Sequence, residues 1–222
     1  MSDVWWRLAW LTLFAIAMAH VEAALVVHLR TIYYPDDPLT IFPLAILTQR
    51  DLAIELAREV ATIVMITSVA LLAERRPVRV FAAFVYVFGL WDICYYLWLK
   101  LMIGWPQSWL EWDVLFLIPW PWFGPWITPV LISLLFVTWG CWMLHQPPDR
   151  RFSRIRFALF ALGVGVVLTS FLLPGADLLA GGTEAFRHFQ PSSYPWALFG
   201  AVYSLMCVGL WWPEGQKKIG PR

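Results

Sequence analysis

Residues 52–73 read LAIELAREVATIVMITSVALLA, an apolar run that also carries Glu55, Arg58 and Glu59. A transmembrane helix needs about 20 predominantly apolar residues, and one charge near the bilayer centre costs roughly 2.5–3.5 kcal/mol on insertion scales. Charges at this depth usually face the interior of a helical bundle, pair with one another or line a functional path. The run therefore predicts a membrane-spanning helix with a polar face.

Similar apolar runs fill most of the chain. Hydrophobic residues make up 60% of the sequence and charged residues only 14%, against about 25% charged residues in soluble domains. The sequence therefore predicts an all-α fold, a polytopic integral membrane bundle that forms one transmembrane domain over residues 1–222. We expect six spans, at residues 4–29, 52–73, 80–103, 123–145, 157–174 and 194–212.

The basic residues between the spans predict the orientation. With six spans, most of them fall on one side of the membrane, and the opposite side has only Arg30, Arg50 and Arg187 in its loops. Cytoplasmic loops carry the excess of positive charge, so we expect a multi-pass protein of the cell inner membrane with both termini cytoplasmic. The basic side comprises Arg7, Arg75, Arg76, Arg79, Arg150, Arg151, Arg154, Arg156, Lys217, Lys218 and Arg222.

The first span contains a feature of secretory signal peptides. Ala17-Met18-Ala19 resembles a signal-peptidase cleavage site. The apolar run nevertheless continues past this site to Leu29, whereas the apolar core of a signal peptide has roughly 7–15 residues. We therefore expect the first span to be retained as a membrane helix.

The charges of the first three spans lie at similar depths. With a rise of 1.5 Å per residue, Glu22 and Glu59 each lie roughly 10 Å, and Asp92 roughly 16 Å, below the outer ends of their spans. Glu55 and Glu59 are four residues apart and share a helix face, and Arg58 is within reach of Glu55. These positions predict a buried carboxylate, arginine and lysine cluster in the outer half of the bundle.

The cluster predicts a binding or catalytic site. The cluster contains four carboxylates and only two cations, Arg58 and Lys100; the carboxylates are Glu22, Glu55, Glu59 and Asp92. We therefore expect this acid-rich cluster to hold a proton or to recruit a metal ion. The alternative is a set of internal salt bridges that lock the helices together. We predict Glu59, Asp92 and Glu22 as catalytic or ion-binding groups. The predicted ligand-binding residues are Glu55, Arg58, Tyr96, Lys100, Asp113 and His188.

A segment rich in tryptophan and proline precedes the fourth span. Five tryptophans and three prolines lie between Trp105 and Trp122, and proline disrupts helices. Irregular backbone at membrane depth survives only where protein covers it or where it lines a wet cavity. We therefore predict an interfacial or re-entrant segment at residues 113–122 on the outer face. An aromatic belt at the membrane surface is the alternative, but it does not explain Glu111 and Asp113.

No motif identifies a reaction. The sequence lacks the histidine sets of membrane desaturases and haem proteins, a glycine-rich loop for phosphate and any paired cysteine motif, because Cys94, Cys141 and Cys207 stand alone. Glu55 and Glu59 lack the nearby histidine of carboxylate-bridged di-metal sites. Cofactor and metal content, and whether the protein is an enzyme, are therefore left open.

Three hypotheses for the function remain, and we give them in order of preference. The first is a small membrane protein that binds or acts on a small polar, ionic or lipid-like ligand from the outer face. The second is an accessory or assembly subunit of a larger membrane complex, and the third is a proton or ion conductor. Expected partners are membrane lipids and a larger complex or a homo-oligomer. A net charge of +1 argues against a nucleic-acid partner.

Overall fold

The protein is a mostly helical bundle. The structure is a computed structural model that describes residues 3–148, 153–176, 178, 185–191 and 193–211. Its labelled elements are α1 (Asp3–Tyr33), α2 (Gln49–Ala73), α3 (Pro77–Ile103), β1 (Trp112–Phe116), β2 (Trp122–Pro125), α4 (Ile127–His145), α5 (Arg154–Leu172), the 3-10 turn η1 (Leu173–Gly175) and α7 (Trp196–Trp211).

Helices α1 to α5 are long and apolar enough to cross a membrane. They cover the first five predicted spans, with ends that differ by a few residues. Helix α7 is apolar but has only 16 residues, and the last predicted residue of its span, Trp212, lies outside the described residues. The helical bundle is therefore confirmed, and the number of spans stays a prediction.

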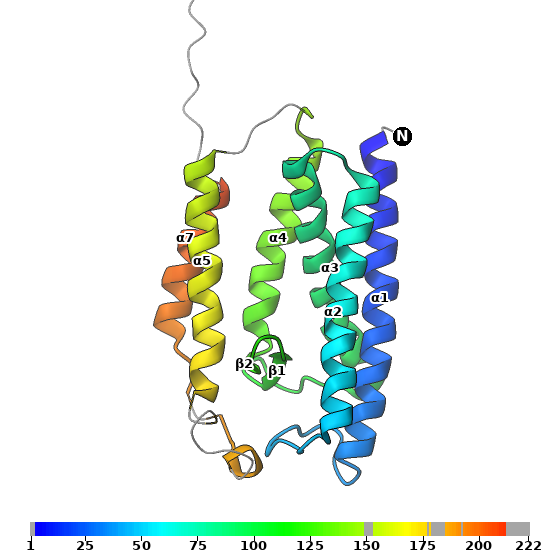
Figure 1. Cartoon of the computed structure of the whole chain (residues 1–222), viewed down its shortest axis with the longest axis vertical. Coiled ribbons are helices and arrows are strands. Elements are labelled where there is room, and N and C mark those ends of the chain that lie inside the picture. Colours follow the sequence, from blue (N-terminus) through cyan, green and yellow to red (C-terminus); the bar gives the residue numbers. More distant parts are fainter. Residues whose placement is uncertain (1–2, 149–152, 177, 179–184, 192, 212–222) are drawn as a thin grey trace, which may run out of the picture.

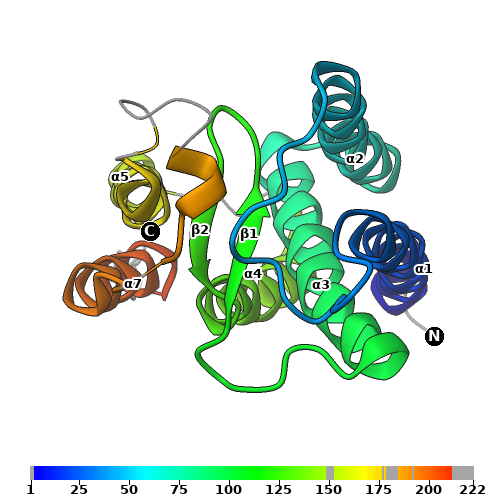
Figure 2. The same cartoon turned by 90° about the horizontal axis from the view of Figure 1, so that it is seen from below.

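Helix α3 lies between α1 and α4, and α5 and α7 pair on the far side of α4 (Figures 1 and 2). Helix α2 packs on α3 and scarcely contacts α1. The backbones of α3 and α4 approach closely at two glycines. A Cβ atom on Gly89 would lie 2.6 Å from the carbonyl oxygen of Ser133, and one on Gly140 would lie 2.7 Å from that of Ala82. Only residues without a side chain allow this contact.

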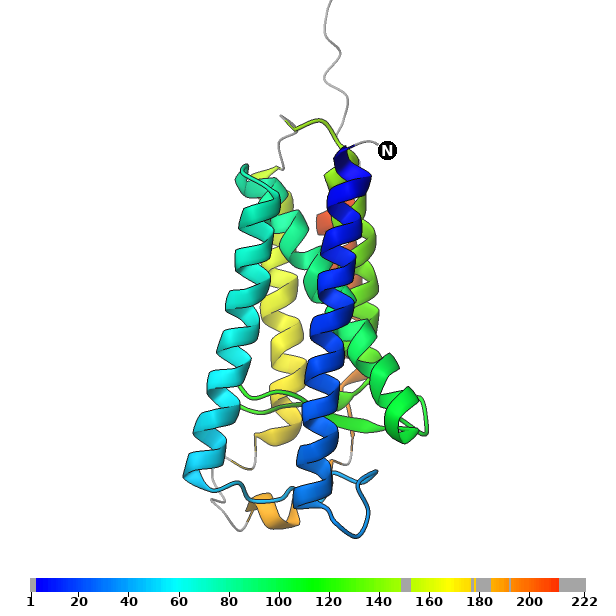
Figure 3. The same ribbon diagram turned by 90° about the vertical axis from the view of Figure 1, so that its right-hand side faces the viewer.

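Local signals set the helix ends. The hydroxyl group of Thr48 accepts a hydrogen bond from the backbone N–H of Asp51 at 3.2 Å and so caps α2. Helix α3 begins at Pro77 and ends at Ile103, and Gly104 follows as its cap with a φ of 76°, in the left-handed region. Helices α1 and α3 end where α2 and α4 begin, close to the two strands (Figure 3). We call this end of the bundle the hairpin end, and the opposite end the N-terminal end.

The segment rich in tryptophan and proline, which the sequence predicts to be an interfacial or re-entrant segment rather than a helix, forms an antiparallel hairpin, a strand pairing that the all-α prediction did not include. Asp113 pairs with Gly124 and Val114 with Phe123. The hairpin lies between the helices (Figures 1 and 3), and Phe123 is fully buried. Strand pairing satisfies backbone groups that prolines would leave open in a helix. Because β2 ends at Pro125, α4 begins at Ile127 rather than at the predicted residue 123.

The first helix is longer than predicted. It continues past Leu29 to Tyr33, so Arg30 belongs to its last turn rather than to a loop. Only 4% of Arg30 is exposed. Its guanidinium group lies over the indole ring of Trp105, 4.0 Å from the ring centroid. This contact with the aromatic ring compensates for part of the hydration that the guanidinium group loses on burial. It explains how the last turn of the helix can hold a buried charged residue.

Candidate functional site

A cavity of about 420 Å³ lies at the hairpin end. Its walls come from the last turns of α1, the first turns of α2, the middle of α3 and the hairpin, and the connection between α1 and α2 covers it together with Phe186. Most of the lining is apolar. The polar side chains that line it are Glu22, Arg30, Tyr33, Tyr34, Glu55, Arg58, Glu59, Asp92, Tyr95, Tyr96 and Asp113.

One group of charges joins α1, α2 and α3. Arg58 donates from Nε to Glu55 at 2.8 Å and from Nη1 to Glu22 at 2.5 Å. The second carboxylate oxygen of Glu22 accepts a hydrogen bond of 2.7 Å from the indole N–H of Trp91. Arg58 and Glu55 meet because they are three residues apart on one helix. These contacts satisfy Glu22 and attach α2 to a helix that it otherwise scarcely touches.

Glu59 and Asp92 hold two other elements in place. Both carboxylate oxygens of Glu59 accept from the backbone N–H of Leu117, at 2.9 and 3.0 Å, just after strand β1. Asp92 accepts a hydrogen bond of 2.9 Å from the hydroxyl group of Ser133 on α4. Within the described residues, neither carboxyl group forms an ion pair, and Oδ1 of Asp92 makes no hydrogen bond.

Asp113 is buried at the base of the hairpin. One carboxylate oxygen accepts from the hydroxyl group of Tyr96 at 3.1 Å, and the other accepts from the backbone N–H of Val114 at 3.0 Å. The latter oxygen also lies 3.6 Å from Nη2 of Arg30. Burial raises the pKa of the Asp113 carboxyl group above its ordinary value, and the positive charge of Arg30 opposes that rise.

Arg30 lines the cavity with a buried donor whose hydrogen bonding is incomplete. Its Nη1 atom is buried and has no hydrogen-bond partner among the described residues. Its ion pair with Asp113, at 3.6 Å, is longer than the 2.7–2.9 Å of a charge-assisted hydrogen bond. An unsatisfied buried donor costs about 1–3 kcal/mol, and a charged donor costs more. A hydrogen-bond acceptor supplied by a bound molecule would remove this cost.

The structure places most of the predicted site residues around the cavity. Lys100 and His188 are the exceptions. Lys100 folds back over the end of α3, donating to the carbonyl oxygens of Gly104 at 2.9 Å and Pro106 at 2.7 Å, and it does not line the cavity. His188 is exposed, two residues after the lining residue Phe186, and does not itself line the cavity.

The sequence interpretation missed Arg30 and Trp91. A signal for Arg30 was present, because Glu22, Val26 and Arg30 are spaced by four residues and therefore share one face of α1. All three line the cavity. The hydropathy of the run falls at Arg30, which led to its assignment to a loop. The indole N–H of Trp91 carried no signal, because one tryptophan in an aromatic-rich span is indistinguishable from a packing residue.

The carboxylates do not converge on one point. The described residues contain no group of three or more His, Cys, Asp or Glu side chains placed to hold a metal ion. Comparisons with models of protein families, with curated proteins and with solved structures found no match for this chain. The geometry itself combines an apolar cavity, an open cationic donor at Arg30 and an open acceptor at Asp92. Such an arrangement can bind a small amphipathic molecule.

Proposed function

We propose that the protein is a membrane protein whose cavity at the hairpin end binds a small amphipathic molecule. An acceptor group of this molecule, a carbonyl, carboxylate or phosphate oxygen, hydrogen-bonds the guanidinium group of Arg30. The observation that carries the proposal is the buried Nη1 atom of Arg30, which has no partner within the described residues. A cavity of about 420 Å³ is in the usual range of small-molecule sites, roughly 300–1,000 Å³.

The proposed membrane arrangement uses all six apolar helices, with the shorter α7 as the sixth span. Arg7, Arg75, Arg76 and Arg79 lie together at the N-terminal end of the bundle, which supports a cytoplasmic position for that end. The hairpin end and its cavity then face the outside of the cell membrane. The ligand reaches the cavity from that face or from the outer leaflet.

The acidic residues receive two roles. Glu22 and Glu55 position Arg58 and the helices. Asp92 and Glu59 are the candidates for proton exchange or for binding a polar group of the ligand, because neither is neutralised by an ion pair among the described residues. Asp92 is the stronger candidate, since Oδ1 stays open whereas both oxygens of Glu59 bind Leu117.

Native mass spectrometry of the protein released gently from its own membranes tests this proposal. The wild-type protein is expected to carry a non-covalent small molecule that Arg30→Met loses. Arg50→Met is the matched control, because Arg50 is exposed at the same end of the bundle, and it is expected to keep the molecule. A wild-type protein without a bound molecule, or equal retention in both variants, would contradict the proposal.

An accessory subunit of a larger membrane complex is the second candidate. It is favoured by the large exposed side chains of Trp109 and Leu110 beside the hairpin, which offer a contact to another protein. The same experiment separates the two candidates. A fixed-ratio assembly with larger chains, unchanged in Arg30→Met, would support the accessory role. A proton or ion conductor has less support, because the core towards the N-terminal end is apolar. The hydroxyl groups of Thr12 and Tyr86 lie there and share a hydrogen bond of 2.8 Å with each other.

A further inference from the structure

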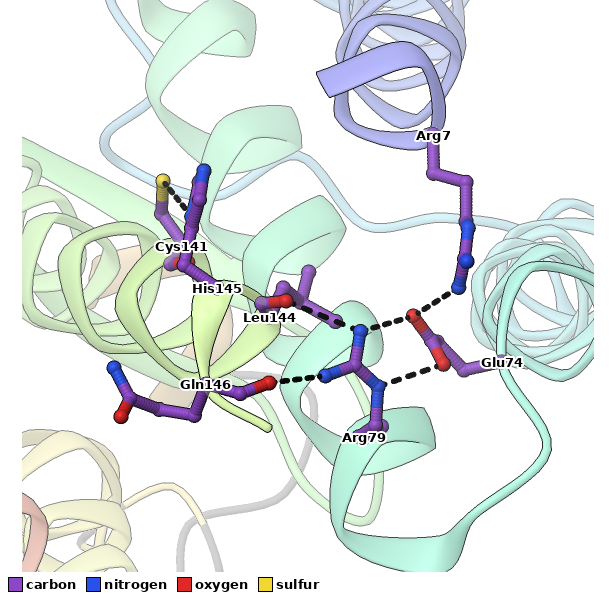
Figure 4. Close-up of polar contacts among 7 residues, drawn as sticks. All are labelled: Arg7, Glu74, Arg79, Cys141, Leu144, His145 and Gln146. Carbon is purple, nitrogen blue, oxygen red and sulfur yellow. Dashed lines mark hydrogen bonds and ion pairs between the residues drawn. The ribbon is translucent and has the colours of Figure 1, made fainter. Parts of the chain in front are cut away.

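A second cavity, of about 520 Å³, lies at the N-terminal end, away from the site described above. It is bounded by the first turns of α1, the connection between α2 and α3, and the end of α4. Figure 4 shows several of the polar side chains that meet there. Four arginines and a single carboxylate line this cavity, which we call the arginine pocket: Arg7, Glu74, Arg75, Arg76 and Arg79.

Arg79 and Glu74 form the rigid part of the pocket. Arg79 donates to both oxygens of Glu74, at 2.9 and 2.8 Å, and to the carbonyl oxygens of Gln146 at 3.0 Å and Leu144 at 3.1 Å (Figure 4). Every nitrogen of this guanidinium group therefore has a partner. Its charge is balanced by Glu74, and its hydrogen bonds tie the connection between α2 and α3 to the end of α4.

The other three arginines are not balanced. Arg7 makes one hydrogen bond, 2.9 Å long, to the Glu74 oxygen that Arg79 already uses, and its side chain is 41% exposed. Arg75 and Arg76 are exposed and form no hydrogen bond or ion pair through their side chains with the described residues. Among the described residues, one carboxylate thus faces four guanidinium groups, which gives the pocket an excess of positive charge.

Large apolar and aromatic side chains are exposed beside the pocket. Leu72, two residues before Glu74, is 79% exposed, and Trp5 and Trp6 are exposed in the first turns of α1. Tryptophan favours the level of the lipid headgroups. Trp5 also packs edge-on against His145 in the pocket wall, with ring centroids 4.7 Å apart. The exposed apolar side chains could contact lipid acyl chains, and the arginines could contact a charged headgroup.

We propose that the arginine pocket binds a phosphate-bearing anion, either the headgroup of an anionic phospholipid or a soluble phosphate compound. Guanidinium groups match phosphate oxygens in geometry as well as in charge, because each offers two parallel N–H donors. Basic pockets on the cytoplasmic side of membrane proteins suit such headgroups. Arg75 and Arg76, in the connection between α2 and α3, would bind the phosphate from one side, and Arg7 would bind it from α1.

The test uses the full chain in nanodiscs that contain phosphatidylcholine and a minor fraction of phosphatidylglycerol. Native mass spectrometry counts the lipids that each protein retains on release. We expect the wild-type protein to retain phosphatidylglycerol in preference to phosphatidylcholine, and Arg75→Gln/Arg76→Gln to lose this preference at least ten-fold. Arg75→Lys/Arg76→Lys keeps the charge but not the paired donors, and it should fall between the two.

Two controls separate the possible explanations. Arg50→Gln removes an exposed charge at the opposite end and should leave the preference unchanged. Inorganic phosphate at millimolar concentration should not displace the lipid if the ligand is a headgroup. Displacement by phosphate would assign the pocket to a soluble phosphate compound. Equal retention of both lipids without phosphate binding, or equal loss in Arg50→Gln, would overturn the proposal. Because Arg30→Met leaves this pocket intact, the two proposed sites fail independently.

Discussion

Two buried arginines at opposite ends of the bundle differ in how completely they are satisfied. Arg79, 7% exposed, donates to a carboxylate and to two carbonyl oxygens. Arg30, 4% exposed, has a long ion pair, an aromatic ring and a nitrogen without a partner among the described residues. Burial is the same, but the hydrogen bonding is not. The complete hydrogen bonding of Arg79 is typical of a structural residue. The incomplete hydrogen bonding of Arg30 is typical of a residue that binds a ligand.

The largest expected effect is on stability at Arg79. Arg79→Met leaves the buried Glu74 with only the half-exposed Arg7 and removes hydrogen bonds to two carbonyl groups. Breaking a buried ion pair by removing one partner costs about 3–5 kcal/mol. We expect a strongly lowered thermal midpoint or a loss of folded protein, measured in detergent by tryptophan fluorescence. Arg75→Met, which changes an exposed neighbour, should have almost no effect. Similar thermal midpoints for Arg79→Met and Arg75→Met would contradict the structural role of Arg79.

A smaller effect on stability is expected at Arg30. Arg30→Met deletes a weak ion pair and an unsatisfied donor, and it keeps an apolar side chain beside Trp105. The loss should therefore be about 1–2 kcal/mol, since buried Asp113 keeps Tyr96 and Val114 as partners. The double variant Arg30→Met/Asp113→Asn should recover part of this loss. A destabilisation as large as that of Arg79→Met would show that Arg30 is a structural residue, like Arg79.

The smallest expected effect is on pH dependence. Asp113 has a pKa raised by burial above the ordinary 3.8, so the folded protein holds this proton more tightly than the unfolded chain does. The resulting stabilisation is present at low pH and is lost as pH rises through the raised pKa. Arg30→Met removes the opposing charge and should extend this loss to higher pH. Asp113→Asn should abolish it.

Thermal midpoints measured from pH 4 to pH 8 in the same detergent provide the check. The curves for wild type and Arg30→Met are expected to separate as pH rises, while Asp113→Asn stays flat in comparison. Parallel curves for all three proteins would mean that Arg30 and Asp113 do not interact electrostatically.

The parts of the fold that depend on local pattern could be predicted from the sequence. Long apolar runs correspond to α1 through α5. The charges inside these runs indicated residues that line one cavity, because a membrane-spanning helix leaves few other places for a carboxylate. Glu55 and Arg58 pair as their three-residue spacing implies. Each of these inferences uses only helical geometry and the cost of burying charge.

The parts that depend on contacts between distant residues could not be predicted. The hairpin forms because residues 112–116 pair with residues 122–125 inside a shell of helices, and hydropathy does not encode that pairing. Lys100 follows a four-residue stripe with Asp92 and Tyr96, yet its long side chain reaches the free carbonyl groups after α3 instead. Arg30 enters the site because Trp105, far along the chain, covers it.

A high-resolution cryo-electron microscopy map of the full chain in nanodiscs, prepared with the lipids of its own membrane, tests the central claim most directly. The cavity at the hairpin end should hold non-protein density, with a polar group at hydrogen-bond distance from the guanidinium group of Arg30. The contradictory result is a cavity without such density, in which Arg30 turns to form a short, two-pronged ion pair with Asp113. Arg30 would then be a structural residue of the same kind as Arg79.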